Sequence, residues 1–167
     1  IRACIDSGVN YLDFADGADF VFGVSKLDDL ARTKDVFALS GASSFPVLTA
    51  AVMREMAKMG DIESAWGGIA PSPYAGIGLN VMRAVVGYAG EPVQLWRNGA
   101  YSAVGLGESR TATIAVPGHV PLKHLRFSLV DVPDLRVIPP DHPHLKDIWM
   151  GAGPQPVLLH RMLNALA

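Results

Sequence analysis

The residues best suited to chemistry in this sequence lie just after two short apolar segments. Asp13 and Asp16, three positions apart, lie at the carboxyl end of the mostly apolar segment 9–15, and a run of small residues at positions 40–44 (Ser-Gly-Ala-Ser-Ser) follows the apolar segment 36–39. Carboxylates and accessible backbone N–H groups can bind the polar parts of a ligand. If the two apolar segments are parallel strands, both groups lie at the edge of the sheet where open α/β proteins bind ligands.

The two aspartates need not share a role. For Asp13 we favour a structural one, in which the side chain caps its own loop and the following helix. For Asp16 that role and a contact with a cofactor or substrate remain equally open, because polar residues at strand ends often line binding sites.

The small-residue loop is the second candidate, with Gly41, Ala42, Ser43 and Ser44 as its proposed binding residues. Small side chains let the backbone approach a ligand closely, and a helix that begins here offers free N–H groups to carbonyl or carboxylate oxygens. Ser44 is also a suitable N-cap, with Pro46 in the first helical turn, and the two roles are compatible. We do not expect a nucleophilic serine, because the loop has no G-x-S-x-G motif.

Histidines do not suggest a metal centre in this chain. No H-E-x-x-H motif is present, and Cys4 is far from every histidine in the sequence, so we predict no metal site. His160, next to Arg161, could bind a substrate carboxylate, although a solvent-facing position is favoured for it. For the other histidines we favour surface loops; they are His119, His124, His142 and His144.

Composition limits the class of protein. Half of the 167 residues are hydrophobic and 18% are charged, which allows a buried core. A net charge of −2 gives no electrostatic reason to expect nucleic acid or an anionic membrane as a partner. The single cysteine excludes an internal disulfide and fits a reducing compartment, so we expect a cytoplasmic protein. No apolar segment approaches the roughly 20 residues that span a bilayer.

Helices and strands alternate up to about residue 60, which predicts an α/β domain built around a parallel sheet. Gly8 and Gly60 are the expected helix stops. Residues 20, 24, 27 and 31 should form the apolar face of the second helix. The expected helices cover residues 1–8, 18–34 and 44–59, and the expected strands cover residues 9–15 and 36–39.

After residue 60 strands follow strands, which predicts an α+β domain with a mostly antiparallel sheet over residues 61–167. Asn98-Gly99 is a strong hairpin signal between strands at 93–96 and 101–104, because both turn positions need a positive φ. Further strands are expected at 62–70, 111–116, 126–130, 135–138 and 148–150, and helices at 78–88 and 156–167.

Several stretches, taken in order, resemble the saccharopine dehydrogenase-like NAD(P)-dependent oxidoreductases. They are ACIDSGVNYLDFADGADF, VFALSGASSFPVLTAAV, GLNVMRAVVGYAGEPVQLWRNGAY, FSLVDVPDL and LLHRML. The resemblance implies that residues 1–60 are the C-terminal portion of a Rossmann-like nucleotide-binding domain, with the loop at 41–44 beside the nicotinamide. It also implies that residues 61–167 belong to an incomplete substrate and dimerisation domain. The implied activity is hydride transfer between NAD or NADP and a C=N, C=O or C=C bond of a small-molecule substrate, in a homodimer.

The Gly-rich cofactor turn of that family is absent from this sequence and would lie upstream of Ile1. We therefore expect an internal fragment that is inactive alone and does not bind NAD(H) or NADP(H). The alternative is a non-catalytic oligomerisation or small-ligand-binding module that keeps the fold without the cofactor loop. A G-x-G-x-x-G motif upstream in the gene would separate the two hypotheses. Because strand 11–16 would have an open edge, we also expect self-association.

Overall fold

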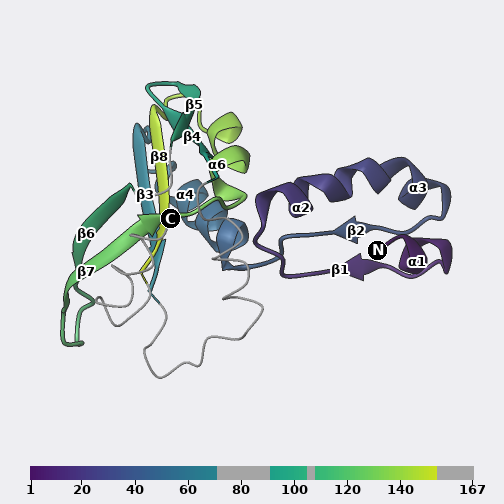
Figure 1. Ribbon diagram of the computed structural model, residues 1–167, viewed down its shortest axis with the longest axis horizontal. Helices are drawn as coiled ribbons and strands as arrows, with labels where there is room; N and C mark the ends of the chain where they lie inside the picture. The colour runs from purple at the N-terminus through teal and green to yellow at the C-terminus, as the bar shows by residue number, and fades with distance from the viewer. Residues whose placement is uncertain (71–90, 105–107, 154–167) are drawn as a thin grey trace. The chain divides into compact units, whose positions relative to one another are not determined.

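A computed structural model describes residues 1–70, 91–104 and 108–153 of the chain (Figure 1). It divides into two compact units, which are described separately. The first comprises Ile1–Ser64 and Asp131–Lys146, and the second comprises the described parts of Ala65–Val130 and Asp147–Ala167. The helices expected at 78–88 and 156–167, and with them His160, lie outside the described residues.

The first unit is mainly helical, with one pair of short strands. Its elements are α1 (Arg2–Asp6), β1 (Tyr11–Leu12), α2 (Ala18–Gly23), η1 (Val24–Leu27), α3 (Asp28–Thr33), β2 (Ala38–Leu39), η2 (Ser44–Leu48), α4 (Thr49–Met56), α6 (Asp134–Val137) and η3 (Pro139–Asp141).

β1 and β2 pair in parallel, with Tyr11 opposite Ala38 and Leu12 opposite Leu39, so the predicted parallel pairing is confirmed. Figure 1 shows the α2–η1–α3 crossover lying along this pair. Both strands are shorter than predicted. Side chains take over the pairing at both ends, because the Asn10 carboxamide oxygen accepts a hydrogen bond from the Phe37 N–H and Asp13 binds the loop after β2.

The helix predicted over 18–34 consists of α2, the 3₁₀ turn η1 and α3. Val24 and Ala31 are buried as predicted, but Phe20 is 51% exposed and its place on the apolar face was wrong. The 3₁₀ turn winds more tightly than an α-helix, which rotates the residues before it relative to those after it. Ala18 takes the buried position on α2 instead.

The helix predicted to begin at Ser44 begins later. Ser44 makes no side-chain cap, Phe45 has extended dihedral angles (φ −102°, ψ 122°), and the Phe45–Pro46 peptide is cis. The backbone therefore forms the irregular turn η2 first, and regular helix starts at Thr49. The prediction of a Ser44 N-cap was wrong, because local signals for capping do not determine the conformation of the following residue.

Residues 135–138, predicted as a strand, belong instead to the helix α6 (Asp134–Val137) and its C-cap Ile138. Val137 and Ile138 donate backbone hydrogen bonds to the carbonyl oxygens of Pro133 and Asp134. Leu135 and Ile138, three residues apart, are both buried, which is the spacing of a helix as well as a short apolar run. Together with η3, this segment packs with the first unit, although it lies in the middle of the predicted second domain.

The second unit consists mainly of strands. Its elements are β3 (Ser64–Ile69, whose first residue belongs to the first unit), β4 (Val93–Arg97), β5 (Ala100–Val104), β6 (Ser109–Ile114), β7 (Leu122–Leu129) and β8 (Asp147–Ala152). The strands predicted at 62–70, 111–116, 126–130 and 148–150 are thus confirmed with shifted ends.

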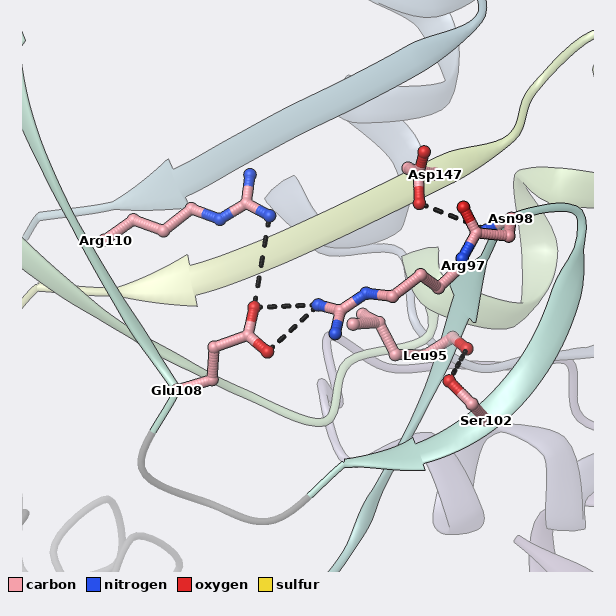
Figure 2. A network of polar contacts seen from close by, with 7 residues as sticks. All are labelled: Leu95, Arg97, Asn98, Ser102, Glu108, Arg110 and Asp147. Atoms are coloured by element: carbon pink, nitrogen blue, oxygen red, sulfur yellow. Dashed lines mark hydrogen bonds and ion pairs between the residues drawn. The ribbon is translucent and has the colours of Figure 1, made fainter.

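The strands of the second unit form a four-stranded sheet, in the order β3-β8-β7-β6, and a separate β4-β5 hairpin. β6 with β7 and β7 with β8 pair antiparallel, whereas Figure 2 shows β3 and β8 running in the same direction. The sheet is therefore mixed and mostly antiparallel. The hairpin is confirmed, with Asn98 and Gly99 at φ 52° and 74°.

Aromatic rings lying over glycines form the core of this sheet. Trp149 and Phe127 are each 1% exposed. Trp66 stacks on Trp149 at 6.2 Å between ring centroids and meets Phe127 edge-on at 5.5 Å. A Cβ atom on Gly68 or Gly151 would lie within 3 Å of these rings, so glycine is needed at both positions for the rings to lie flat on the sheet.

Candidate functional site

Asp13 is the centre of the polar contacts at the carboxyl ends of β1 and β2. Its Oδ1 atom accepts hydrogen bonds from the Ala15 N–H (2.9 Å), the Gly41 N–H (3.1 Å) and the Ser40 hydroxyl (2.8 Å). The Asp13 carbonyl oxygen also accepts a bond from the Ala42 N–H at 2.9 Å. One residue thus binds the loop after β1 to the loop after β2, which confirms a structural role for Asp13 in its loop. The predicted cap of the following helix was wrong, because α2 begins at Ala18 with no side-chain cap.

These contacts keep the Asp13 carboxylate ionised. Burial alone would raise its pKa, but the Ala15 and Gly41 N–H groups and the Ser40 and Tyr11 hydroxyls outweigh it, and the pKa is lowered. The same hydrogen bond from Tyr11, followed by burial and the carboxylate's charge, raises the pKa of the Tyr11 phenol. Both groups therefore hold their ordinary charge states firmly at neutral pH.

The loop Ser40–Ser44 lies at the carboxyl edge of the parallel pair, as predicted. Gly41 has φ 80°, and a Cβ atom there would lie 3.0 Å from a Val21 methyl group, so the position needs glycine for its conformation and its packing on α2. The N–H groups of Gly41 and Ala42 are bound to Asp13 and are not open to a ligand. These two residues shape the loop.

Ser43 and Ser44 are the parts of the loop that remain open. Their hydroxyl groups have no hydrogen-bond partner among the described residues, and Ser44 is exposed. Asp16 is also exposed, one residue beyond Ala15, whose carbonyl oxygen would lie 3.7 Å from a Cβ atom on Gly41. No hydrogen bond or ion pair of the Asp16 carboxylate occurs within the described ranges. Ser43, Ser44 and Asp16 can therefore offer two hydroxyls and a carboxylate to a polar ligand at this edge.

A second carboxylate of the first unit is in a very different environment. Asp134 is 0% exposed, and no hydrogen bond of normal geometry reaches its oxygens from the described protein groups. Burial raises the pKa of Asp134. Contacts with the Thr49 hydroxyl and with the backbone N–H of Asp134 itself offset this rise only in part. Arg136, two residues on, is bound instead to Asp19 (3.1 Å) and Asp131 (3.5 Å).

A hollow between α4, α6 and η3 was not foreseen from the sequence. It has a volume of about 380 Å³, and its lining comes from Ala50, Arg54, Ala57, Val137, Ile138, Asp141 and His142. The two sides of this hollow are at least 80 positions apart in the chain. No local pattern marks it, because the hollow forms only where the folded chain brings α4 next to α6 and η3.

In the second unit the main polar cluster joins β4 to the start of β6 (Figure 2). The Glu108 carboxylate accepts two hydrogen bonds of 2.9 Å from Arg97 and lies 3.9 Å from Arg110. The Arg110 guanidinium also lies 4.9 Å from the centre of the buried Trp149 ring. Two cations share one carboxylate here, an arrangement that fixes the β4 hairpin beside the sheet.

Metal ligands do not gather in the described part of the chain, where no group of three or more His, Cys, Asp or Glu side chains could hold an ion. His119, His124 and His144 are exposed and His142 is half-buried. Within the same residues, no helix has the length and apolar character needed to cross a membrane.

Known protein families do not identify this chain. No family model matches it, and no curated protein matches it significantly.

Proposed function

We propose that this chain is part of a saccharopine dehydrogenase-like oxidoreductase that moves a hydride between NAD or NADP and a C=N, C=O or C=C bond of a small substrate. The observation that carries the proposal is the set of hydrogen bonds around the Asp13 carboxylate. It holds a loop of small residues at the carboxyl edge of two parallel strands, which is where ligands bind to open α/β sheets.

The groups that remain open in this loop fit the nicotinamide end of such a cofactor. The Ser43 and Ser44 hydroxyls can donate to a carboxamide oxygen or accept from its NH₂ group. When bound, the cofactor supplies the hydride chemistry. The chain's own part is to orient the ring, with Asp13 holding the loop in place and Gly41 allowing it to pack tightly on α2. The sequence contains no G-x-G-x-x-G motif for the pyrophosphate end.

Steady-state kinetics of the full-length gene product would test this role. Ser43→Leu should raise KM for NADH or NADPH, or lower kcat, because the larger side chain occupies space at the loop. The matched control is Ser102→Leu, on the exposed strand β5. Equal, small effects at both positions, or no binding of either nucleotide by the full-length protein, would contradict the proposal.

One observation favours the alternative, a non-catalytic association module. Leu12 and Leu39, which are partners in the β1-β2 pair, are each 51% exposed. Phe14, two residues after β1, and Phe37, directly before β2, are 72% and 53% exposed. A homodimer that covers this face would use it without any cofactor. Light scattering of the wild type and of Leu39→Lys would show whether association depends on this face.

A further inference from the structure

The hollow between α4, α6 and η3 combines an apolar lining with one charge of each sign. The apolar lining comes from Ala50 on α4 and Ala57 just after it, and from Val137 on α6 and Ile138 just after it. The two alanines leave open the space that larger side chains would fill. Its volume of about 380 Å³ lies within the range of small-molecule sites, which begins at about 300 Å³.

Arg54 and Asp141 form a loose ion pair beside this apolar lining. The Arg54 Nη2 atom lies 4.0 Å from the Asp141 Oδ2 atom, and the two side chains are 76% and 65% exposed. The Arg54 guanidinium makes no hydrogen bond to any described residue. Such a pair adds little stability and can open at small cost, because both groups are already largely hydrated. Each partner can then bind an opposite charge of a ligand.

The two charges together restrict the kind of ligand. A simple anion that binds Arg54 would be repelled by Asp141, and a simple cation would be repelled by Arg54. A molecule that carries both charges close together satisfies both residues, and a short aliphatic part would contact the Ala, Val and Ile side chains. Charge-assisted hydrogen bonds to a guanidinium and a carboxylate are among the stronger polar contacts in proteins.

We propose that this hollow binds a small aliphatic zwitterion, with the ligand's carboxylate on Arg54 and its ammonium group on Asp141. Aliphatic α-amino acids and carboxybetaines share this chemistry. The site has no residue in common with the Ser40–Ser44 loop. It does not rest on the proposed hydride transfer, so the failure of either proposal leaves the other intact.

Titrations followed by NMR of the backbone amides of the full chain would test the site. L-valine should shift the amide signals of Ala50, Ala57, Val137 and Ile138. Isovalerate, which lacks the ammonium group, and isobutylamine, which lacks the carboxylate, should each bind at least about tenfold more weakly, because each loses one charge-assisted contact. Glycine betaine, whose nitrogen cannot donate a hydrogen bond, separates the two ligand types. Weaker binding than that of valine assigns the site to primary ammonium compounds, and equal binding assigns it to both.

Two variants should lose valine binding by the same factor of about ten, namely Arg54→Met and Asp141→Asn. The matched controls are Arg32→Met and Asp28→Asn, which remove an exposed ion pair of the same residue types on α3 and should leave the affinity unchanged. Ala57→Leu, which fills the hollow without changing a charge, should also abolish the shifts. The proposal fails if valine gives no local shifts, if isovalerate binds as tightly as valine, or if the control variants weaken binding equally.

Discussion

Asp13 and Asp134 belong to the same compact unit, yet their surroundings have opposite effects on their charge. Asp13 lies where two loops meet, and their N–H and hydroxyl groups point at its carboxylate, so its pKa is lowered. Asp134 lies at the start of α6, fully buried, and burial raises its pKa. The difference shows that burial and hydrogen-bond donors shift the pKa of a carboxylate in opposite directions, with the donors outweighing burial at Asp13 and burial outweighing the donors at Asp134.

The largest effect is expected from removing the carboxylate of Asp13. Asp13→Ala should lower the free energy of unfolding by about 2 to 3 kcal/mol, because the Gly41 and Ala15 N–H groups lose a charged acceptor. Urea denaturation followed by circular dichroism measures this. Asp16→Ala is the control, since this exposed side chain has no described partner and should change stability by under about 0.5 kcal/mol. Equal losses of unfolding free energy in Asp13→Ala and Asp16→Ala would contradict the structural role of Asp13.

Replacing the buried carboxyl group of Asp134 should increase stability, whereas the loss of the Asp13 carboxylate decreases it. Asp134→Asn should raise the free energy of unfolding at neutral pH by about 1 to 2 kcal/mol, because a neutral amide of the same shape costs less to bury. Asp141→Asn on the exposed η3 turn is the control and should be close to neutral. A loss of stability in Asp134→Asn would contradict this prediction, because it would mean that the contact with the Thr49 hydroxyl outweighs the cost of burying the carboxylate.

A smaller difference in stability should distinguish Ser40, whose hydroxyl donates to Asp13, from Ser44, whose hydroxyl has no described partner. The Ser40 hydroxyl lies 2.8 and 2.9 Å from the two Asp13 oxygens, so Ser40→Ala should cost about 1 kcal/mol. Ser44→Ala should cost almost nothing, because its hydroxyl has no described partner. The same denaturation experiment applies. If Ser44→Ala is the more damaging change, Ser44 has a structural role that the contacts do not indicate.

The smallest effect is expected in the pH dependence of folding stability, to which Asp13 and Asp134 should contribute in opposite directions. The lowered pKa of Asp13 gives stability that is present above its unfolded pKa, about 3.9, and is lost as the pH falls through its folded value. The raised pKa of Asp134 costs no stability below the unfolded pKa, and the cost grows as the pH rises towards its folded value. We therefore compare the free energy of unfolding of each variant with that of the wild type from pH 3 to 7. At neutral pH Asp13→Asn should be less stable than the wild type and Asp134→Asn more stable, and both differences should shrink as the pH falls.

The sequence predicted those elements whose cause is local. Asn98-Gly99 favours a tight turn because both residues can adopt a positive φ, and the hairpin forms between the two predicted strands, with Trp96 paired with Tyr101. The parallel pairing of β1 and β2 followed from two apolar segments separated by a helical crossover. Prediction was wrong at 135–138, because a run of four residues fits a strand and a helical turn equally well, and packing in the first unit decides between them.

The sequence predicted which residue types lie at the candidate site, but it did not predict the contacts that they make. The sequence by itself determined that small residues follow β2 and that carboxylates follow β1. The tertiary structure alone decided that Asp13 binds Ser40 and Gly41, 27 and 28 positions away. Within this loop, the side chains without a described partner are then those of Ser43 and Ser44. The tertiary structure also decided that Arg54 meets Asp141 in the lining of the hollow between α4, α6 and η3. Local conformation follows from the preferences of neighbouring residues, whereas these contacts depend on which distant segments the chain brings together when it folds.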